Sequence, residues 1–257
     1  MSALVIDIDG VVLRDNRAIP GAPEFVARLA AGTRPYVFLT NFSSQTPADL
    51  RNRFLEAGID VDVGRFYTSA MATAEFLRDQ PRGQRKAFVI GEGALVHALY
   101  EAGFILSEAD ADFVVLGETT SYHFDMIQRA SQLILAGARF IATNPDVAGP
   151  AGRPSCGALA APIEKITGRR PFYIGKPSPI MMRAALRHLK VHSEEAWMVG
   201  DNMDTDIIAG IESGMGTILV LTGVSKADDL TRYAYRPHHV VASVSDILPL
   251  LERVSRG

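Results

Sequence analysis

Short apolar strands alternate with amphipathic helices along almost the whole chain, and this alternation constrains the fold more than any other feature. The apolar runs that we interpret as strands lie at residues 4–6, 36–40, 87–90, 113–116, 140–143, 172–174, 196–199 and 217–221. Helical patterns separate most of them, and glycines at several of their ends are typical helix stops. Strands that alternate with helices in this way predict an α/β fold built on a parallel sheet.

A polar segment at residues 79–86, which contains proline and glycine, is the best candidate for a linker. Beyond it the alternation of strands and helices restarts and forms a small α/β unit of its own. We therefore predict a Rossmann-like parallel-sheet core made of residues 1–80 and 174–257. A smaller α/β domain, residues 81–173, is inserted into that core.

Polar clusters follow three strands of the two outer segments. The clusters are Asp7 with Asp9, Thr40 with Asn41, and Asp201 with Asp206, and Lys176 lies in a Gly-Lys-Pro turn before a capped helix. In open parallel sheets the carboxyl ends of the strands share the edge at which ligands bind. Neighbouring carboxylates repel each other unless a positive charge lies between them. A divalent cation is therefore expected, and Mg²⁺ is usually held by one or two protein carboxylates.

This set of side chains suits phosphoryl transfer, which needs a nucleophile, charge neutralisation and a proton donor for the leaving group. Asp7, directly at the end of its strand, is the predicted nucleophile and would form an aspartyl-phosphate. Asp9 would protonate the leaving oxygen and later activate water. Mg²⁺ between Asp7 and Asp201 would reduce the repulsion between nucleophile and substrate. The phosphoryl oxygens would be bound by Thr40, Asn41 and Lys176.

The charge and cysteine content narrow the classes of partner. A net charge of −3 gives no electrostatic footprint for a nucleic acid polymer. The single cysteine, Cys156, excludes an internal disulfide, fits a reducing compartment, and is expected to be a buried residue rather than a nucleophile. The first strand begins too early for a secretory leader, and no apolar run approaches the roughly 20 residues that span a bilayer. We expect a cytoplasmic protein with no membrane contact.

Two functions of other classes stay open at this point. The turn at Gly91-x-Gly93 follows a strand and opens a helix, as in the dinucleotide-binding fingerprint, but the third glycine is missing. An oxidoreductase that binds a dinucleotide at this turn is therefore one alternative. A protein that binds a phosphorylated ligand without catalysis is the other.

The polar motifs, in this order, resemble those of the haloacid dehalogenase superfamily of aspartyl-phosphate phosphatases. Asp7-Ile-Asp9-Gly-Val is similar to its first motif, Thr40-Asn41 to its second, Gly-Lys176-Pro to its third, and Gly-Asp201-x4-Asp206 to its fourth. An α/β insertion between the second and third motifs resembles the C2-capped branch of that superfamily. Within that branch the chain resembles the NagD type along nearly its whole length. The segments that carry this likeness are 40–46, 67–73, 91–94, 117–119, 142–146 and 175–179.

The resemblance implies an active site between the core and the inserted cap. It also implies that Asp9 contacts Mg²⁺ through its backbone carbonyl, that Asp201 is a side-chain ligand, and that Asp206 supports the metal shell. The substrate loop of the cap would comprise Asn144 and Asp146, together with the turn at residues 156–158. Residues 147–152, which are small, depart from the family pattern and leave the substrate preference open.

The resemblance further implies small phosphomonoesters as substrates, with nucleoside monophosphates first, so a 5′-nucleotidase is the leading expectation. Sugar phosphates and pyridoxal phosphate are the alternatives within the same fold. Transfer of the phosphoryl group to an acceptor other than water uses the same chemistry. Assembly of a homo-oligomer through the cap is a further expectation.

Overall fold

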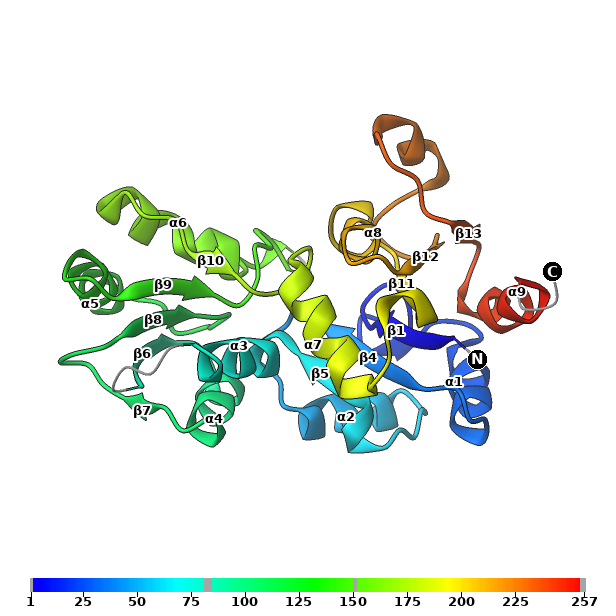
Figure 1. The fold of residues 1–257 in the computed structure, drawn as a ribbon, viewed down its shortest axis with the longest axis horizontal. Coiled ribbons are helices and arrows are strands. Elements are labelled where there is room, and N and C mark those ends of the chain that lie inside the picture. Colours follow the sequence, from blue (N-terminus) through cyan, green and yellow to red (C-terminus); the bar gives the residue numbers. More distant parts are fainter. Residues whose placement is uncertain (1, 81–84, 150–151, 255–257) are drawn as a thin grey trace. The chain divides into compact units, whose positions relative to one another are not determined.

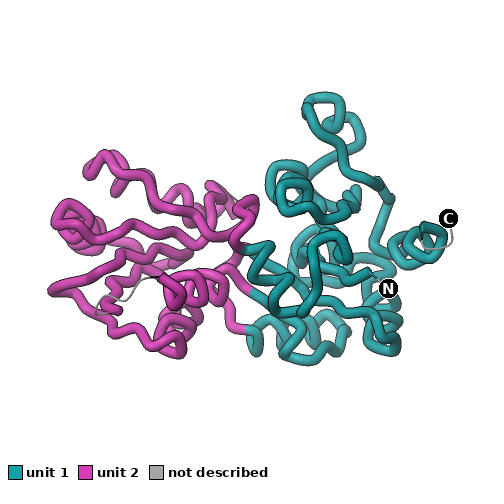
Figure 2. The backbone as a smooth tube through the Cα atoms, viewed as in Figure 1, with its two compact units in different colours: residues 1–40, 47–67, 181–257 teal, residues 41–46, 68–180 magenta. Residues whose placement is uncertain are grey.

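The chain folds into two compact units in a computed structural model, which describes residues 2–80, 85–149 and 152–254 (Figure 2). Unit 1 comprises residues 1–40, 47–67 and 181–257, and unit 2 comprises residues 41–46 and 68–180. The predicted linker at 79–86 falls partly outside the described residues, as does the predicted loop at 147–152. The predicted domain bounds, 1–80 with 174–257 and 81–173, stay a prediction.

Unit 1 is built on a six-stranded sheet in the order β13-β12-β11-β1-β4-β5 (Figure 1). The neighbouring pairs from β13 to β4 are parallel. Its strands are β1 (Ala3–Asp7), β4 (Tyr36–Thr40), β5 (Phe66–Thr68), β11 (Ala196–Gly200), β12 (Gly216–Val220) and β13 (His239–Val241). The strand β1 lies inside the sheet between β11 and β4 and is fully buried, and its last residue, Asp7, pairs with Leu39 of β4.

Unit 2 contains a separate five-stranded sheet in the order β10-β9-β8-β6-β7, with every neighbouring pair parallel. Its strands are β6 (Lys86–Ile90), β7 (Ile105–Leu106), β8 (Phe113–Leu116), β9 (Arg139–Ala142) and β10 (Phe172–Tyr173). Buried side chains of α5 and α6 form one hydrophobic cluster with the strands. The predicted α/β class, with a parallel core sheet and a second, smaller parallel sheet, is confirmed.

Helices connect the strands of both sheets. Unit 1 carries α1 (Ala22–Ala31), α2 (Pro47–Glu56), α8 (Ile208–Glu212), α9 (Ile247–Val254) and nearly all of α7 (Pro179–Leu189). Unit 2 carries α3 (Ser69–Arg78), α4 (Gly93–Glu101), α5 (Phe124–Leu135) and α6 (Cys156–Thr167). The start of α2 shows the sequence logic, since Pro47 opens the helix and Asp49 lies in its first turn, where both are favoured.

A small hairpin follows β1 and is formed by β2 (Leu13–Arg14) and β3 (Arg17–Ala18). The two residues between them, Asp15 and Asn16, have φ angles of 48° and 60°. Two successive left-handed residues are typical of the two-residue turns that join antiparallel strands, and asparagine and aspartate tolerate this conformation well.

Several short elements differ from the sequence-based expectation, and the hairpin strands β2 and β3 are among them. The helix predicted from residue 207 is preceded by a π-helical turn, Met203–Ile207, and the α-helix itself covers only Ile208–Glu212. The strand β7 was not predicted, because it has two residues and both side chains are exposed, so it shows no alternation of apolar and polar positions.

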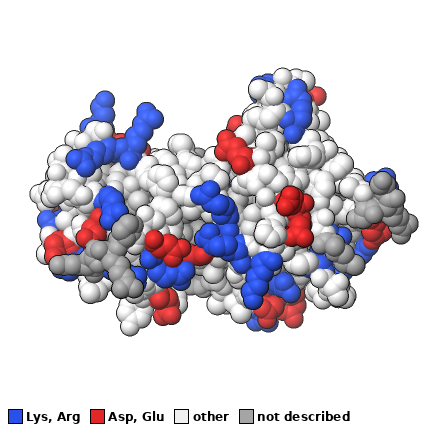
Figure 3. Space-filling view, viewed as in Figure 1, with Lys and Arg blue, Asp and Glu red and all other residues white. Residues whose placement is uncertain are grey.

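The surface agrees with the low net charge. On the face shown in Figure 3, basic and acidic side chains are interspersed on both units, and neither sign covers either unit. Among the described residues, none of the helices combines the length and the apolar character that crossing a bilayer requires.

The core of unit 1 provides a stability prediction. Phe54 of α2 is fully buried, and its ring centroid lies 5.0 Å from that of Phe38 and 4.9 Å from that of Phe66. Phe54→Ala should lower the free energy of unfolding by about 3–5 kcal/mol, because a large cavity remains. The single tryptophan, Trp197, lies in β11, so its fluorescence during urea unfolding reports on unit 1.

The matched control is Leu55→Ala, at the next position of the same helix, where the side chain is 40% exposed. It should cost less than about 1 kcal/mol. Equal costs for the two variants would contradict the packing described here.

Candidate functional site

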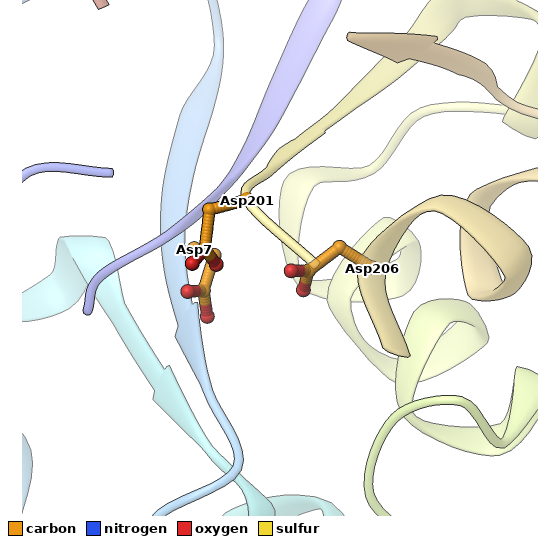
Figure 4. Close-up of side chains that lie close together, drawn as sticks. All are labelled: Asp7, Asp201 and Asp206. Atoms are coloured by element: carbon orange, nitrogen blue, oxygen red, sulfur yellow. The ribbon is translucent and has the colours of Figure 1, made fainter. Parts of the chain in front are cut away.

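Three buried carboxylates lie together at one edge of the unit 1 sheet. Asp7, Asp201 and Asp206 each offer one oxygen, and these oxygens all lie within 4.8 Å of one another (Figure 4). All three side chains are buried. The structure therefore brings together acids that are separated by nearly 200 positions in the sequence, as the shared edge of parallel strands predicts.

The sheet register sets the first two acids side by side. In the parallel pair of β1 and β11, Ile6 is opposite Val199, so Asp7 ends one strand where Gly200 ends the other. Asp201 follows directly. Its side chain is fixed further by the backbone N–H of Val224, which donates to Oδ2 at 2.6 Å.

The π-helical turn returns the third acid to the same place. Asn202 caps this turn, and its carbonyl accepts hydrogen bonds from Asp206 N–H at 3.0 Å and Ile207 N–H at 3.2 Å. In return, the N–H of Asn202 donates to Oδ2 of Asp206 at 3.2 Å. π-helical turns are rare and are found most often at functional sites.

Glycines give the acids the space that they occupy. Gly10 has a φ of +83°, and a Cβ there would lie 2.7 Å from Cγ of Asp201 and 3.1 Å from Cα of Gly223. A Cβ at Gly200 would lie 2.5 Å from Oδ2 of Asp206. Side chains at either position would push the carboxylates apart, so the close approach depends on glycine.

The donor set defines what this cluster can do. Three buried carboxylates with no cation between them would carry a large electrostatic and desolvation cost. Hard divalent cations prefer carboxylate oxygens as ligands. The cluster therefore fits a metal ion, with Asp7, Asp201 and Asp206 as the residues able to hold it.

The side chain of Asp9 points to a different partner. It lies beyond the end of β1 and forms an ion pair with Arg53 of α2, whose two terminal nitrogens contact both carboxylate oxygens. The carboxylate of Asp9, two residues after Asp7, is therefore not a member of the acidic cluster. Nothing in the sequence pattern singles out Arg53, which occupies an ordinary polar position of an amphipathic helix.

The other predicted site residues lie in unit 2, except Thr40, which is buried at the end of β4. Asn41 joins two of them. Its side-chain NH₂ donates to Asp146 at 3.0 Å and to the carbonyl of Lys176 at 3.0 Å, while its oxygen accepts from the N–H of Lys176 at 2.8 Å. Asn144 donates to the carbonyl of Asn41 at 2.8 Å. Four predicted residues are therefore brought together by direct hydrogen bonds.

A buried glutamate beside this group carries no predicted role. Glu118 follows β8, and its carboxylate accepts hydrogen bonds from the N–H of Ser43 at 2.9 Å, from the hydroxyl of Ser155 at 3.2 Å, and from the Ser43 hydroxyl and Asn144. These bonds connect segment 41–46 to the rest of unit 2. The available signal was an acidic residue shortly after a buried strand, with only Gly117 between the strand and Glu118.

Two protein-family models match this chain, one near each end. Residues 4–105 match the family model described as haloacid dehalogenase-like hydrolase. Residues 173–247 match a second model, which describes HAD-hydrolase-like proteins. The two matched segments contain Asp7 and Asp9, and Lys176, Asp201 and Asp206, respectively.

Three relatives resemble the chain along nearly its whole length. The ribonucleotide monophosphatase NagD of Escherichia coli strain K12 is 54% identical, with 95% of this chain and 97% of the relative covered. The solved structure of NagD from E. coli K-12 has a TM-score of 0.93 at 53% identity and covers 96% of this chain and 98% of that chain. A dihydroxyacetone phosphatase of Corynebacterium glutamicum strain R is 47% identical, covering 94% and 88%. The 5′-nucleotidase YutF of Bacillus subtilis strain 168 is 37% identical, covering 96% and 97%.

The only cysteine of the sequence gives a prediction for this region. Cys156 is fully buried at the start of α6, as expected, and burial, followed by the nearby charge of Glu118, raises the pKa of its thiol to about 12. The thiol therefore stays protonated at pH 8, whereas an unfolded cysteine is partly ionised there. Native protein should react with a disulfide reagent such as dithiobis-nitrobenzoate at least about 1,000-fold more slowly than urea-unfolded protein.

The control is the same labelling reaction, measured at pH 7 and at pH 9 for the native and the unfolded chain. At both pH values the native chain should react far more slowly than the unfolded chain, because a buried thiol with a pKa of about 12 stays almost fully protonated over this range. Rapid stoichiometric labelling of the native protein would contradict the burial of Cys156.

Proposed function

This chain belongs to the NagD family of haloacid dehalogenase-like hydrolases and is a phosphatase, and we propose that it hydrolyses nucleoside monophosphates with Mg²⁺ as its cofactor. The observation that carries the proposal is the buried cluster of Asp7, Asp201 and Asp206, whose oxygens lie within 4.8 Å of one another. The nucleotide specificity rests on the 54% identity to the E. coli ribonucleotide monophosphatase.

In the proposed reaction Asp7 attacks the phosphorus atom and forms an aspartyl-phosphate. Its place at the end of a buried inner strand supports this role, because a nucleophile gains from fixed orientation. Asp9 gives a proton to the leaving oxygen as the ester bond breaks. It then takes a proton from the water that hydrolyses the aspartyl-phosphate.

The acidic cluster supports Mg²⁺ as the metal. Carboxylate oxygens suit this ion, which usually binds through one or two carboxylates, water and substrate phosphate oxygens. When bound, the ion neutralises part of the charge that the substrate phosphate brings to the site. Asp7 and Asp201 would hold it with their side chains and Asp9 with its backbone carbonyl, while Asp206 would support the shell.

We further propose that Thr40, Asn41 and Lys176 bind the phosphoryl group, and that Asn144 and Asp146 contact the rest of the substrate. The hydrogen bonds that hold Asn41 to Lys176 and Asp146 support a shared role. Because the side-chain amide of Asn41 is already bonded to these partners, direct donation from it to a phosphoryl oxygen requires an exchange of those bonds.

Dihydroxyacetone phosphate is a second candidate substrate, favoured by the 47% identity to the C. glutamicum phosphatase. Sugar phosphates and pyridoxal phosphate stay alternatives of the same chemistry. The dinucleotide reading of the Gly91 turn has a packing explanation instead, because a Cβ at Gly91 would lie 2.8 Å from Cδ2 of Leu95. Assembly through the cap and a cytoplasmic location stay predictions.

The nucleophile assignment has a direct test. Asp7→Asn should fold normally but lose phosphate release from adenosine 5′-monophosphate by at least about 1,000-fold, because an amide cannot form the aspartyl-phosphate. Phosphate release is measured with Mg²⁺ present, across nucleoside monophosphates, dihydroxyacetone phosphate, sugar phosphates and pyridoxal phosphate. The unsubstituted chain should show its highest kcat/KM on a nucleoside monophosphate.

The control is Asp60→Asn, whose carboxylate is largely exposed and pairs with Arg51 in unit 1. It should keep full activity. Full activity in Asp7→Asn would remove Asp7 from the mechanism, and a clear preference for dihydroxyacetone phosphate would replace the nucleotide proposal.

The metal proposal is tested by chelation. Excess EDTA should abolish phosphate release, and added Mg²⁺ should restore it, because the buried acids need a cation when an anionic substrate binds. Asp201→Asn should raise the Mg²⁺ concentration for half-maximal activity by at least about tenfold.

The matched control is Asp204→Asn on the same π-helical turn. Its exposed carboxylate accepts a hydrogen bond from the Tyr233 hydroxyl at 2.7 Å. This variant should leave the Mg²⁺ requirement unchanged. Activity that survives EDTA would exclude the metal.

A further inference from the structure

Arg53 occupies a position between the carboxylate of Asp9 and the turn of the β2–β3 hairpin. Its guanidinium contacts both oxygens of Asp9, with NH1 to Oδ2 at 3.3 Å, and its Nε donates to Oδ1 of Asn16 at 2.7 Å. Its side chain is only 13% exposed, against 31% for that of Asp9. Three nitrogens of the guanidinium therefore donate hydrogen bonds, two to Asp9 and one to Asn16.

Both partners of Arg53 are themselves fixed. Asn16 lies in the two-residue turn with a φ of 60°, and the strands on either side pair Leu13 with Ala18. The N–H of Gly10, next to Asp9, donates to the carbonyl of Leu13 at 2.8 Å. A closed set of contacts thus runs from Asp9 through Arg53 and the hairpin turn, and back to the residue after Asp9.

We propose that Arg53 is a positioning residue for Asp9, and that it ties the direction of the Asp9 carboxylate to the hairpin turn through Asn16. The inference rests on the proposed function, in which Asp9 is the proton acceptor of the second half-reaction. A guanidinium that contacts both oxygens fixes the plane of a carboxylate, which a single point charge does not. Two of the guanidinium nitrogens contact Asp9 and a third contacts Asn16. The orientation of the Asp9 carboxylate is therefore set by hydrogen-bond geometry as well as by charge.

The second half-reaction is the step that such positioning serves. Water attacks the aspartyl-phosphate, an oxygen–phosphorus bond forms, and the bond between phosphorus and the Asp7 oxygen breaks. The proton of the attacking water passes to the Asp9 carboxylate. A carboxylate that turns away from the water accepts no proton, so this step slows when Arg53 is lost.

The first half-reaction separates from the second when the substrate is p-nitrophenyl phosphate. The p-nitrophenolate ion is stable and leaves without a proton, so formation of the aspartyl-phosphate on Asp7 does not need Asp9 as an acid. Hydrolysis of that intermediate still needs a base. A defect confined to Asp9 orientation therefore produces a fast release of about one p-nitrophenolate per enzyme, followed by a slow phase, which is the kinetic sign of an accumulating covalent intermediate.

The experiment compares Arg53→Gln with Arg51→Gln in rapid-mixing kinetics with Mg²⁺ and p-nitrophenyl phosphate. Arg51 is on the same helix, and it donates to the carbonyl of Val61 at 3.1 Å and to Asp60 at 3.2 Å without touching Asp9. Arg53→Gln should show the burst and a steady state slowed by roughly 10- to 100-fold, a part of what a general base contributes. Arg51→Gln should behave as the unsubstituted chain.

Further variants complete the test. Arg53→Lys keeps the positive charge but not the two-nitrogen contact of the guanidinium, so it should show the same burst with a smaller loss of steady-state rate. It replaces Arg53→Gln if circular dichroism shows that Arg53→Gln is misfolded. Asn16→Ala should show a weaker burst of the same kind, and unchanged kinetics in Asn16→Ala would overturn the link to the hairpin. Equal slowing of burst and steady state, or no difference between Arg53→Gln and Arg51→Gln, would overturn the role of Arg53. No p-nitrophenolate release by the unsubstituted chain would instead overturn the proposed function, and this inference with it.

Discussion

The repulsion between three buried carboxylates is the constraint on which the site depends. Asp7, Asp201 and Asp206 approach within 4.8 Å in the buried edge of the unit 1 sheet, where water screens little of their charge. The sheet register and the capped π-helical turn place them there, and the glycines at 10, 200 and 223 leave room for their side chains. A rigid cluster of like charge favours a cation among its members, so the backbone geometry is what makes this edge of the sheet fit a metal ion.

The sequence predicts most of this cluster because the same local pattern, an apolar run that ends in a polar residue, recurs along the chain. Each apolar run reaches its polar ending at the same edge of the sheet, so Asp7 and Asp201 could be expected to meet without any knowledge of side-chain packing. The return of Asp206 was less predictable, since it depends on a π-helical turn, and the 3.6-residue period of apolar positions carries no sign of such a turn. Arg53 was not predictable at all. Its helix shows an ordinary apolar stripe, and the contact with Asp9 comes from a long side chain that reaches across to another element.

Asn41 shows how a buried polar side chain can hold the backbone of a distant residue in place. From the sequence, an asparagine after a buried strand is expected to face the substrate. In the structure its side chain holds both main-chain polar groups of Lys176 and one oxygen of Asp146. Buried polar groups must find partners, and those of Asn41 are two other residues that the sequence analysis singled out. The placement of Lys176 therefore depends on Asn41, whatever the substrate contacts of Asn41 itself.

The fully buried thiol of Cys156 makes the chain convenient for spectroscopy. A protein whose one native sulfhydryl is shielded from solvent can be given a single new cysteine and labelled there selectively, without first replacing the native one. A nitroxide or a fluorophore attached in each unit would then report the separation of units 1 and 2 in solution as ligands come and go. Trp197, the one indole of the chain, already supplies an intrinsic donor inside unit 1.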